Sequence, residues 1–244
     1  MRTQSDAINI FDFDGTLTPY FLPKWTVLMK CGLADGAMSP EFLEMAKETA
    51  ARKGLDIYQA LYDVYFTLLK EHGIALTDEN FCLGAQEIEY NDGVLEFLQR
   101  LQNSGMKNYI LSSGLKVYLE KSQAASLVAG IYATEFSYDD AGEANGIKSL
   151  MSDKNKVQAI KEICQQNNGR EDDCTNVVYV GDGFTDYYAM EYVKQHGGAT
   201  VFVYRDPESK DLAAIREKNV VDLYTLVDFA AGSELDKYIS SLRG

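Results

Sequence analysis

One stretch near the start decides the fold: Ile8-Asn9-Ile10-Phe11-Asp12-Phe13-Asp14-Gly15-Thr16-Leu17-Thr18. The apolar residues that lead into Asp12 predict a buried β-strand, which ends at two carboxylates. Asp12 and Asp14 are two residues apart, so their side chains leave an extended backbone on the same face. Gly15 then permits a sharp turn. The pair suits a divalent cation, with one carboxylate as nucleophile and the other as proton carrier. A strand end with an Asp-Gly turn is the alternative.

A calcium-binding helix–loop–helix site does not fit this stretch. Such a loop needs glycine at its sixth position and glutamate at its twelfth. Counted from Asp12, those positions hold Leu17 and Pro23. The spacing therefore excludes this type of calcium site.

Composition indicates an ordinary globular protein of 244 residues, with 46% hydrophobic and 25% charged residues. This length suffices for one sizeable core with a smaller insert. The net charge of −14 argues against nucleic acid or an anionic membrane as the main partner. No signal-like or membrane-spanning stretch is present, and the four cysteines have no zinc-binding spacing. We therefore expect a cytoplasmic protein with reduced thiols.

The hydrophobic pattern predicts two parts. Residues 19–90 are expected to form an all-helical insert, because apolar residues recur there at helical spacing. Residues 1–18 and 91–244 alternate strand and helix, the pattern of an α/β fold with a Rossmann-like parallel sheet. Strands are expected at 108–111, 131–138, 177–180 and 200–204, a hairpin turn at 139–143, and a closing helix over 224–242.

Three of the predicted strands end in small or polar clusters. These are Asp12 with Asp14, then Ser112-Ser113-Gly114, and finally Asp182 with Asp186. Ligand sites in such sheets lie at the carboxyl ends of the strands. We therefore expect the three clusters to converge on one site.

The ordered motifs resemble the haloacid dehalogenase superfamily of phosphatases, and within it the phosphoserine-phosphatase-like branch. The matching residues, in chain order, are Asp12-Phe13-Asp14-Gly15-Thr16, Ser112, Lys154 and Gly181-Asp182-Gly183-Phe184-Thr185-Asp186. The helical insert resembles the type 1 cap of that superfamily. The resemblance implies a phosphatase that acts on a small phosphorylated substrate and uses Mg²⁺.

The resemblance also implies roles for the matching acidic residues. Asp12 would be the nucleophile that forms an aspartyl-phosphate, and Asp14 the general acid and base. Mg²⁺ would be held by the Asp12 carboxylate, the Asp14 backbone carbonyl and the Asp182 carboxylate. Asp186, in the same motif as Gly183, would orient the catalytic lysine or a water on the metal.

The remaining motif residues would bind the phosphoryl group. Ser112 would donate a hydrogen bond to it, and the Gly15 and Ser113 region would offer backbone N–H groups. Lys154 would neutralise its charge. Lys156 is the alternative for this lysine, but the family's Lys-x-x-Val pattern favours Lys154.

A second phosphatase signature in the sequence is a chance match. Cys164 and Arg170 fit the Cys-x5-Arg pattern of cysteine-dependent phosphatases, whose loop must follow a strand. Val157, Ile160 and Ile163 make a helical stripe that includes Cys164, so the pattern predicts a buried cysteine near a helix end. We therefore exclude it as the nucleophile.

The helical insert would select the substrate. Tyr20, Phe21, Lys24 and Trp25 follow the first motif closely and are candidates to contact the substrate beyond its phosphate. Phosphoserine phosphatases carry a glutamate nine residues after the nucleophile, where this chain has Phe21. This departure favours a different phosphomonoester. The tyrosines at 58, 62 and 65 share one helical face, which favours packing against other helices; a tyrosine at the mouth of the pocket is the alternative. A phosphotransferase or mutase that uses the same aspartyl-phosphate, or a non-catalytic binding protein, is the alternative.

Overall fold

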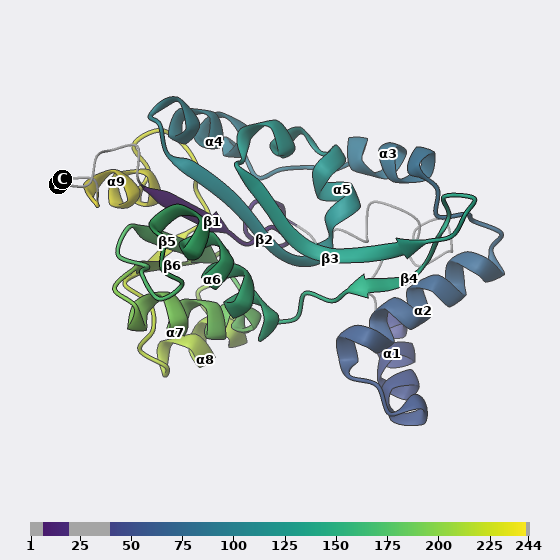
Figure 1. The fold of residues 1–244 in the computed structure, drawn as a ribbon. Helices are drawn as coiled ribbons and strands as arrows, with labels where there is room; N and C mark the ends of the chain where they lie inside the picture. Colours follow the sequence, from purple (N-terminus) through teal and green to yellow (C-terminus); the bar gives the residue numbers. More distant parts are fainter. Residues whose placement is uncertain (1–6, 20–39, 243–244) are drawn as a thin grey trace.

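A seven-stranded sheet forms the centre of the computed structural model, which describes residues 7–19 and 40–242 (Figure 1). In chain order its strands are β1 (Ile8–Phe11), β2 (Lys107–Leu115), β3 (Gly130–Tyr138), β4 (Ala144–Ser149), β5 (Val177–Gly181), β6 (Ala199–Tyr204) and β7 (Leu223–Leu226). Their order across the sheet is β4-β3-β2-β1-β5-β6-β7. Every pairing is parallel except that of β3 with β4. The predicted α/β fold with a Rossmann-like parallel sheet is confirmed.

Strand β1 lies in the middle of the sheet because its residues suit burial on both faces. Ile8 and Ile10 pack into the hydrophobic cluster that includes helices α6, α7 and α8. Phe11 points to the opposite face and packs into the cluster that includes α4 and α9. The chain turns away in opposite directions on either side of β1, which makes its carboxyl end the topological switch point where ligands bind in such sheets.

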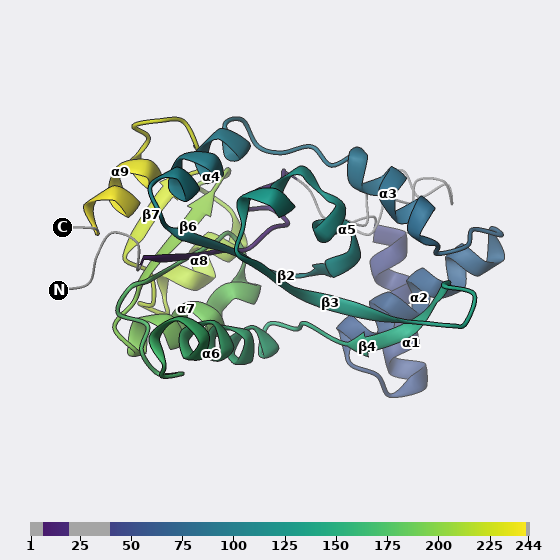
Figure 2. The same ribbon diagram turned by 45° about the horizontal axis from the view of Figure 1, so that its top comes forward.

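Helices cover both faces of the sheet, and helices α1 to α3 lie beyond one end of it, beside the tip of β3 and β4 (Figure 2). Within the described residues the α-helices are α1 (Pro40–Lys53), α2 (Ile57–Glu71), α3 (Asp78–Gln86), α4 (Val94–Asn103), α5 (Lys116–Lys121), α6 (Asn155–Asn168), α7 (Tyr187–Gln195), α8 (Lys210–Arg216) and α9 (Glu234–Ser241). Short 3₁₀ turns span Gln123–Leu127 and Phe184–Asp186. None of the helices in residues 7–19 and 40–242 combines the length and apolar character needed to cross a membrane.

Helices α1 to α3 form the described part of the predicted helical cap, residues 40–90, and no strand occurs there. Helix α2 begins with a capping box in which the Asp56 carboxylate accepts the Gln59 N–H and the Gln59 side chain accepts the Asp56 N–H. The β3–β4 hairpin projects from the sheet and lies against α2 (Figure 1). Helix α2 of the predicted cap therefore contacts a hairpin that the sequence prediction assigned to the core.

Two sequence predictions about secondary structure need correction. The helix predicted over 224–242 is wrong in its first part, because Leu223–Leu226 forms the parallel edge strand β7 against β6 and the helix spans only Glu234–Ser241. The strand predicted over 108–111 continues to Leu115. Its pairing with β3 shifts register between Leu111 and Leu115, so Ser112 and Ser113 lie in an irregular part of β2 and not in a loop beyond it.

Candidate active site

Asp12 lies directly after β1 and receives a hydrogen bond from a buried lysine. The Lys156 Nζ donates to Asp12 Oδ1 at 2.9 Å and to Asp186 Oδ1 at 2.6 Å. The Lys156 side chain is 1% exposed. Burial by itself would lower the pKa of Lys156, but the carboxylates of Asp12 and Asp186 outweigh burial and raise it well above its usual value. The lysine is therefore a fixed positive charge beside the first carboxylate of the motif.

The expectation that Lys154 occupies this place is wrong. Lys154 is exposed at the N-terminal end of α6, with its Nζ 5.9 Å from the centroid of the Tyr188 ring. Lys156 lies on the buried face of α6, one turn before Ile160 and two before Ile163. Helix geometry places residues four and seven apart on one face, so Lys156 points into the sheet with these isoleucines.

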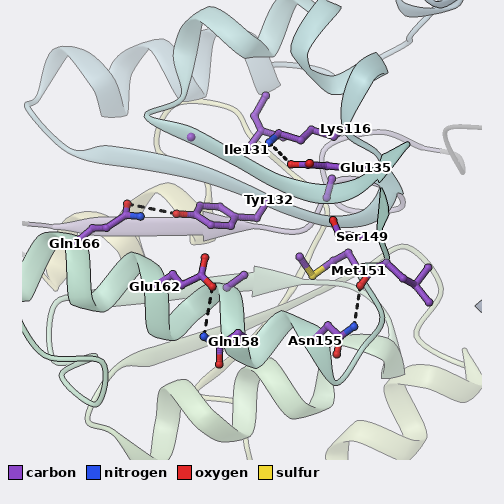
Figure 3. Close-up of a pocket in the computed structure, with 14 residues that line it drawn as sticks. Lys116, Ile131, Tyr132, Glu135, Ser149, Met151, Asn155, Gln158, Glu162 and Gln166 are labelled. Carbon is purple, nitrogen blue, oxygen red and sulfur yellow. Dashed lines mark hydrogen bonds and ion pairs between the residues drawn. The ribbon is translucent and has the colours of Figure 1, made fainter. Parts of the chain in front are cut away.

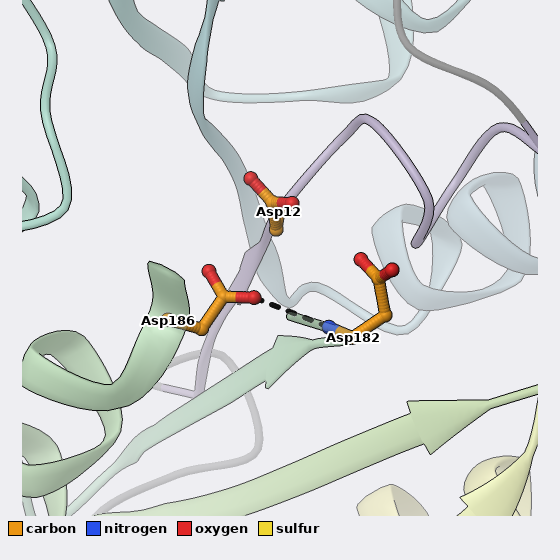
Figure 4. A group of neighbouring side chains, drawn as sticks. All are labelled: Asp12, Asp182 and Asp186. Carbon is orange, nitrogen blue, oxygen red and sulfur yellow. Dashed lines mark hydrogen bonds between the residues drawn. The ribbon is translucent and has the colours of Figure 1, made fainter. Parts of the chain in front are cut away.

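Asp182 and Asp186 complete a group of three carboxylates with Asp12 (Figure 4). One ligand atom of each residue lies within 4.8 Å of those of the other two. The three side chains come from the ends of β1 and β5 and from the 3₁₀ turn before α7. The predicted convergence of these two strand ends is thus confirmed by the geometry.

Asp186 is fully occupied by hydrogen bonds within the protein. Its Oδ1 accepts the Lys156 ammonium and the Tyr179 hydroxyl, each at 2.6 Å. Its Oδ2 accepts the backbone N–H groups of Asp182 and Gly183, both at 3.1 Å. These bonds fix the Gly181–Asp186 turn and the lysine at once, so Asp186 orients its neighbours and leaves Asp12 and Asp182 as the more available carboxylates.

Gly15 is required where the two strand ends meet. Its φ is +86°, and a Cβ built there would lie 2.2 Å from Asp182 Oδ2. The Thr16 hydroxyl donates to Asp182 Oδ1 at 2.8 Å, which holds that carboxylate against the first motif. A larger residue at position 15 would therefore displace Asp182 as well as strain the turn.

The carboxylates of this group outnumber the positive side chains beside them within residues 7–19 and 40–242. Lys156 bonds Asp12 and Asp186, and the charge of Arg205 acts on Asp182, so full ionisation of the three carboxylates exceeds these two cations by one negative charge. Burial, and then the charge of Asp186, raise the pKa of Asp12 to about 7 despite the opposing effect of Lys156. Burial and the charges of Asp12 and Asp186 likewise raise the pKa of Asp182. An all-oxygen group with this excess charge fits Mg²⁺.

Asp14 lies outside the three-carboxylate group and faces the cap. It is half-buried, and its charge adds to the effect of burial that raises the pKa of Tyr62 on α2. The two aspartates of the first motif therefore have different surroundings, one beside a lysine and the other toward the cap.

Ser112 and Ser113 lie where β2 becomes irregular. Ser112 is fully buried, and its Oγ accepts the Gly114 N–H at 2.9 Å. The Oγ of Ser113 is buried without a hydrogen-bond partner among the described residues. A buried hydroxyl without a partner is costly unless a ligand satisfies it. This favours a polar ligand next to the serines.

Arg205, after β6, was not predicted from the sequence. Its guanidinium donates to the carbonyl oxygens of Gly15 at 2.6 Å and Thr18 at 3.1 Å, and to the Asn91 Oδ1 at 3.0 Å. Asn91 in turn donates from its side chain to the carbonyl of Thr16 at 2.7 Å. Arg205 therefore ties the first motif to the segment by which the chain returns from the cap. No local pattern in the sequence signals this contact.

The remaining sequence candidates fall into two groups. Tyr20, Phe21, Lys24 and Trp25 lie outside the described residues. Cys164 lies within α6, fully buried, with its Sγ 3.5 Å from the Sγ of Cys174. The cysteine is not at the start of a loop, so the structure agrees with its exclusion as a nucleophile.

A separate groove of about 580 Å³ lies between β3 and α6 (Figure 3). Its walls share no residue with the carboxylate site. Polar side chains along it pair with one another, as Lys116 does with Glu135 at 2.6 Å and Tyr132 with Gln166 at 3.3 Å. The groove is thus distinct from the site that the motifs form.

Comparisons with known proteins agree with this geometry. The family model of haloacid dehalogenase-like hydrolases matches residues 10–191, and the chain belongs to this family. No curated protein matched the chain.

Solved structures share the fold at low sequence identity. A HAD family hydrolase from Salmonella enterica serovar Typhi is 17% identical, with a TM-score of 0.65 over 94% of this chain and 72% of its own. A substrate-bound phosphoserine phosphatase is 19% identical, with a TM-score of 0.65 over 98% and 99% of the two chains. A phospho-aspartyl intermediate analogue of phosphoserine phosphatase is 21% identical, with a TM-score of 0.64 over 96% and 98%.

Proposed function

We propose that this protein is a Mg²⁺-dependent phosphomonoesterase that hydrolyses a small phosphorylated metabolite through an aspartyl-phosphate on Asp12. The observation that carries the proposal is the buried group at the end of β1, where Lys156 contacts Asp12 and a carboxylate oxygen of Asp182 lies within 4.8 Å of one of Asp12. Family membership and the fold shared with phosphoserine phosphatases support the same chemistry.

In the first step an Asp12 carboxylate oxygen attacks phosphorus and the bond to the leaving alcohol breaks. Asp14 gives its proton to the leaving oxygen. Lys156 keeps a positive charge beside the reacting carboxylate, which opposes the effect of burial and favours the ionised form. The Ser112 hydroxyl, with backbone N–H groups near Gly15 and Ser113, donates to the phosphoryl oxygens.

In the second step water attacks the phosphorus of the aspartyl-phosphate while Asp14 takes its proton. Inorganic phosphate leaves, and both aspartates return to their starting states. Asp12 and Asp182 side chains, with the Asp14 backbone carbonyl, would hold Mg²⁺. When bound, the ion supplies positive charge that stabilises the charge on the phosphoryl oxygens.

The substrate is a small phosphomonoester. Phosphoserine is not favoured, since phosphoserine phosphatases carry a glutamate nine residues after the nucleophile and this sequence has Phe21 at that position. The excess negative charge among the described carboxylates favours binding of the substrate anion together with the metal.

The test is phosphate release from p-nitrophenyl phosphate and from a panel of phosphorylated metabolites, with Mg²⁺ and without any acceptor. We expect wild-type protein to release inorganic phosphate. We also expect acid-quenched protein to carry a hydroxylamine-sensitive phosphate on the peptide that contains Asp12. Phosphate transfer only in the presence of a second hydroxyl compound would indicate a phosphotransferase instead. Binding without turnover of any substrate would indicate a binding protein.

A further inference from the structure

Tyr62 reaches from the cap to the end of β2. Its hydroxyl donates to the backbone carbonyl of Ser113 at 2.8 Å. Its ring is 6% exposed and packs edge-on against Phe136 of the β3–β4 hairpin, with the centroids 5.9 Å apart. The hydroxyl is therefore held in place by packing, and its bond crosses from α2 to the strand that carries Ser112.

The carbonyl that accepts the Tyr62 hydroxyl belongs to the same peptide group as the Gly114 N–H. That N–H donates to the Oγ of Ser112 at 2.9 Å. The Thr134 hydroxyl on β3 also donates to the Ser113 carbonyl, at 3.1 Å. Hydrogen bonds at the oxygen of an amide polarise it and strengthen the bond made by its N–H. Tyr62 thus acts on Ser112 through one rigid peptide plane.

The hydrogen bond from Gly114 decides which way the Ser112 hydroxyl can act. Because Ser112 Oγ accepts the N–H, its own hydrogen is directed to another acceptor. In the proposed reaction that acceptor is a phosphoryl oxygen. A stronger bond from Gly114 removes electron density from Oγ and makes the hydroxyl a better donor.

We propose that Tyr62 is a positioning residue that couples the seating of the cap to phosphoryl binding by Ser112. The relay runs from the Tyr62 hydroxyl through the Ser113–Gly114 peptide to Ser112 Oγ. It is complete only when α2 lies against the end of β2. This inference rests on the proposed function, in which Ser112 binds the phosphoryl group.

The chain offers a matched control for Tyr62. Tyr65 lies one turn further along α2, is also buried, and its hydroxyl lies 3.2 Å from the hydroxyl of Tyr118 on α5. Tyr62→Phe and Tyr65→Phe each remove one cap hydroxyl and keep the ring. The Ser113 carbonyl keeps the Thr134 hydroxyl in Tyr62→Phe, so that variant leaves no unpaired carbonyl.

The experiment measures kcat/KM with p-nitrophenyl phosphate and the inhibition constant of inorganic phosphate, in the wild-type and Ser112→Ala backgrounds. We expect Tyr62→Phe to lower kcat/KM and weaken phosphate inhibition by about three- to tenfold, the effect of one hydrogen bond. Tyr65→Phe should change both by less than about twofold on the same scale. In Ser112→Ala, adding Tyr62→Phe should have almost no further effect.

A purely structural role for Tyr62 predicts a different pattern. The loss from Tyr62→Phe would then be equal in both backgrounds, and that result overturns the relay. Equal losses in Tyr62→Phe and Tyr65→Phe, or none in Tyr62→Phe, also overturn it while leaving the phosphatase proposal intact. Absence of turnover in wild-type protein is a separate outcome, since it removes the proposed function and the relay together.

Discussion

Replacing Lys156 by methionine tests the charge arrangement at the centre of the site. The side chain is 1% exposed and bonds two carboxylates, so its removal leaves these buried negative charges without their counter-ion. Removing one member of a buried ion pair costs about 3–5 kcal/mol of folding free energy. We expect a loss of this size for Lys156→Met at pH 8. Lys154→Met is the matched control, because that lysine is exposed and its loss should change stability by less than about 0.5 kcal/mol.

The loss in Lys156→Met should depend on pH. Lys156 lowers the pKa of Asp12, which is about 7 in the wild type, so removing the lysine raises that pKa. A carboxyl with a folded-state pKa above its unfolded value is most stabilising in acid, and the contribution is lost as pH rises through the folded pKa. The free energy of unfolding of Lys156→Met should therefore be closer to that of the wild type at pH 5 than at pH 8.

Urea unfolding at both pH values, with EDTA present, measures these differences. The reasoning is refuted if Lys154→Met loses more stability than Lys156→Met, or if the loss in Lys156→Met is larger at pH 5. Phosphatase activity should fall in the same order, with Lys156→Met inactive and Lys154→Met close to wild type.

Three further predictions concern the proposed chemistry. Asp12→Asn should lower kcat by orders of magnitude without unfolding the protein, whereas Cys164→Ser should change kcat little. Steady-state kinetics measures kcat and circular dichroism checks folding. An inactive Cys164→Ser beside an active Asp12→Asn would identify the cysteine as the nucleophile instead. EDTA should abolish activity and Mg²⁺ restore it, with Asp182→Asn requiring more Mg²⁺ for half-maximal rate; activity that survives exhaustive chelation would contradict this. Phe21→Ala and Trp25→Ala should alter the ranking of substrates by kcat/KM while Mg²⁺ dependence stays the same, and an unchanged ranking in both would place substrate selection elsewhere.

The sheet and its acidic edge followed from local sequence. The apolar stretch before Asp12 and the continuous run at 177–180 favour buried strands, and parallel sheets bring their carboxyl ends together. Asp12 and Asp182 accordingly meet in the structure, with one ligand atom of each lying within 4.8 Å of the other. The meeting of Asp12 and Asp182 could therefore be predicted from the direction of the strands alone.

The choice between Lys154 and Lys156 depends on helix phase, which a motif match does not report. The apolar positions Ile160 and Ile163 already defined the buried face of α6, and Lys156 is in phase with them. A buried lysine contradicts the usual preference of lysine for solvent, so the pattern argued for exposure at both positions. The two carboxylates that compensate its burial come from residues 144 and 30 positions away.

The segment over 223–242 illustrates a second reason why the sequence alone did not predict the structure. Leu223–Leu226 has too few residues to show a period, and its apolar positions match a helix as well as a strand. Its strand conformation depends on pairing with β6, where Val201 lies opposite Leu223. Contacts such as that of Arg205 with Gly15, 190 positions apart, have no local pattern either.

The β3–β4 hairpin holds the described part of the cap through aromatic contacts. Phe136 on β3 contacts three rings of the cap, those of Tyr62, Phe66 and Phe81, with centroids 5.9, 4.9 and 6.2 Å away. Each aromatic pair contributes about 0.5–1.5 kcal/mol, so a movement that separated all three would be costly. A movement that carries the hairpin with the cap keeps them. The hydroxyls of Thr134 and Tyr62 both donate to the Ser113 carbonyl, in the part of β2 where its pairing with β3 is irregular. The contact of α2 with β2 and the orientation of Ser112 therefore depend on the same few hydrogen bonds.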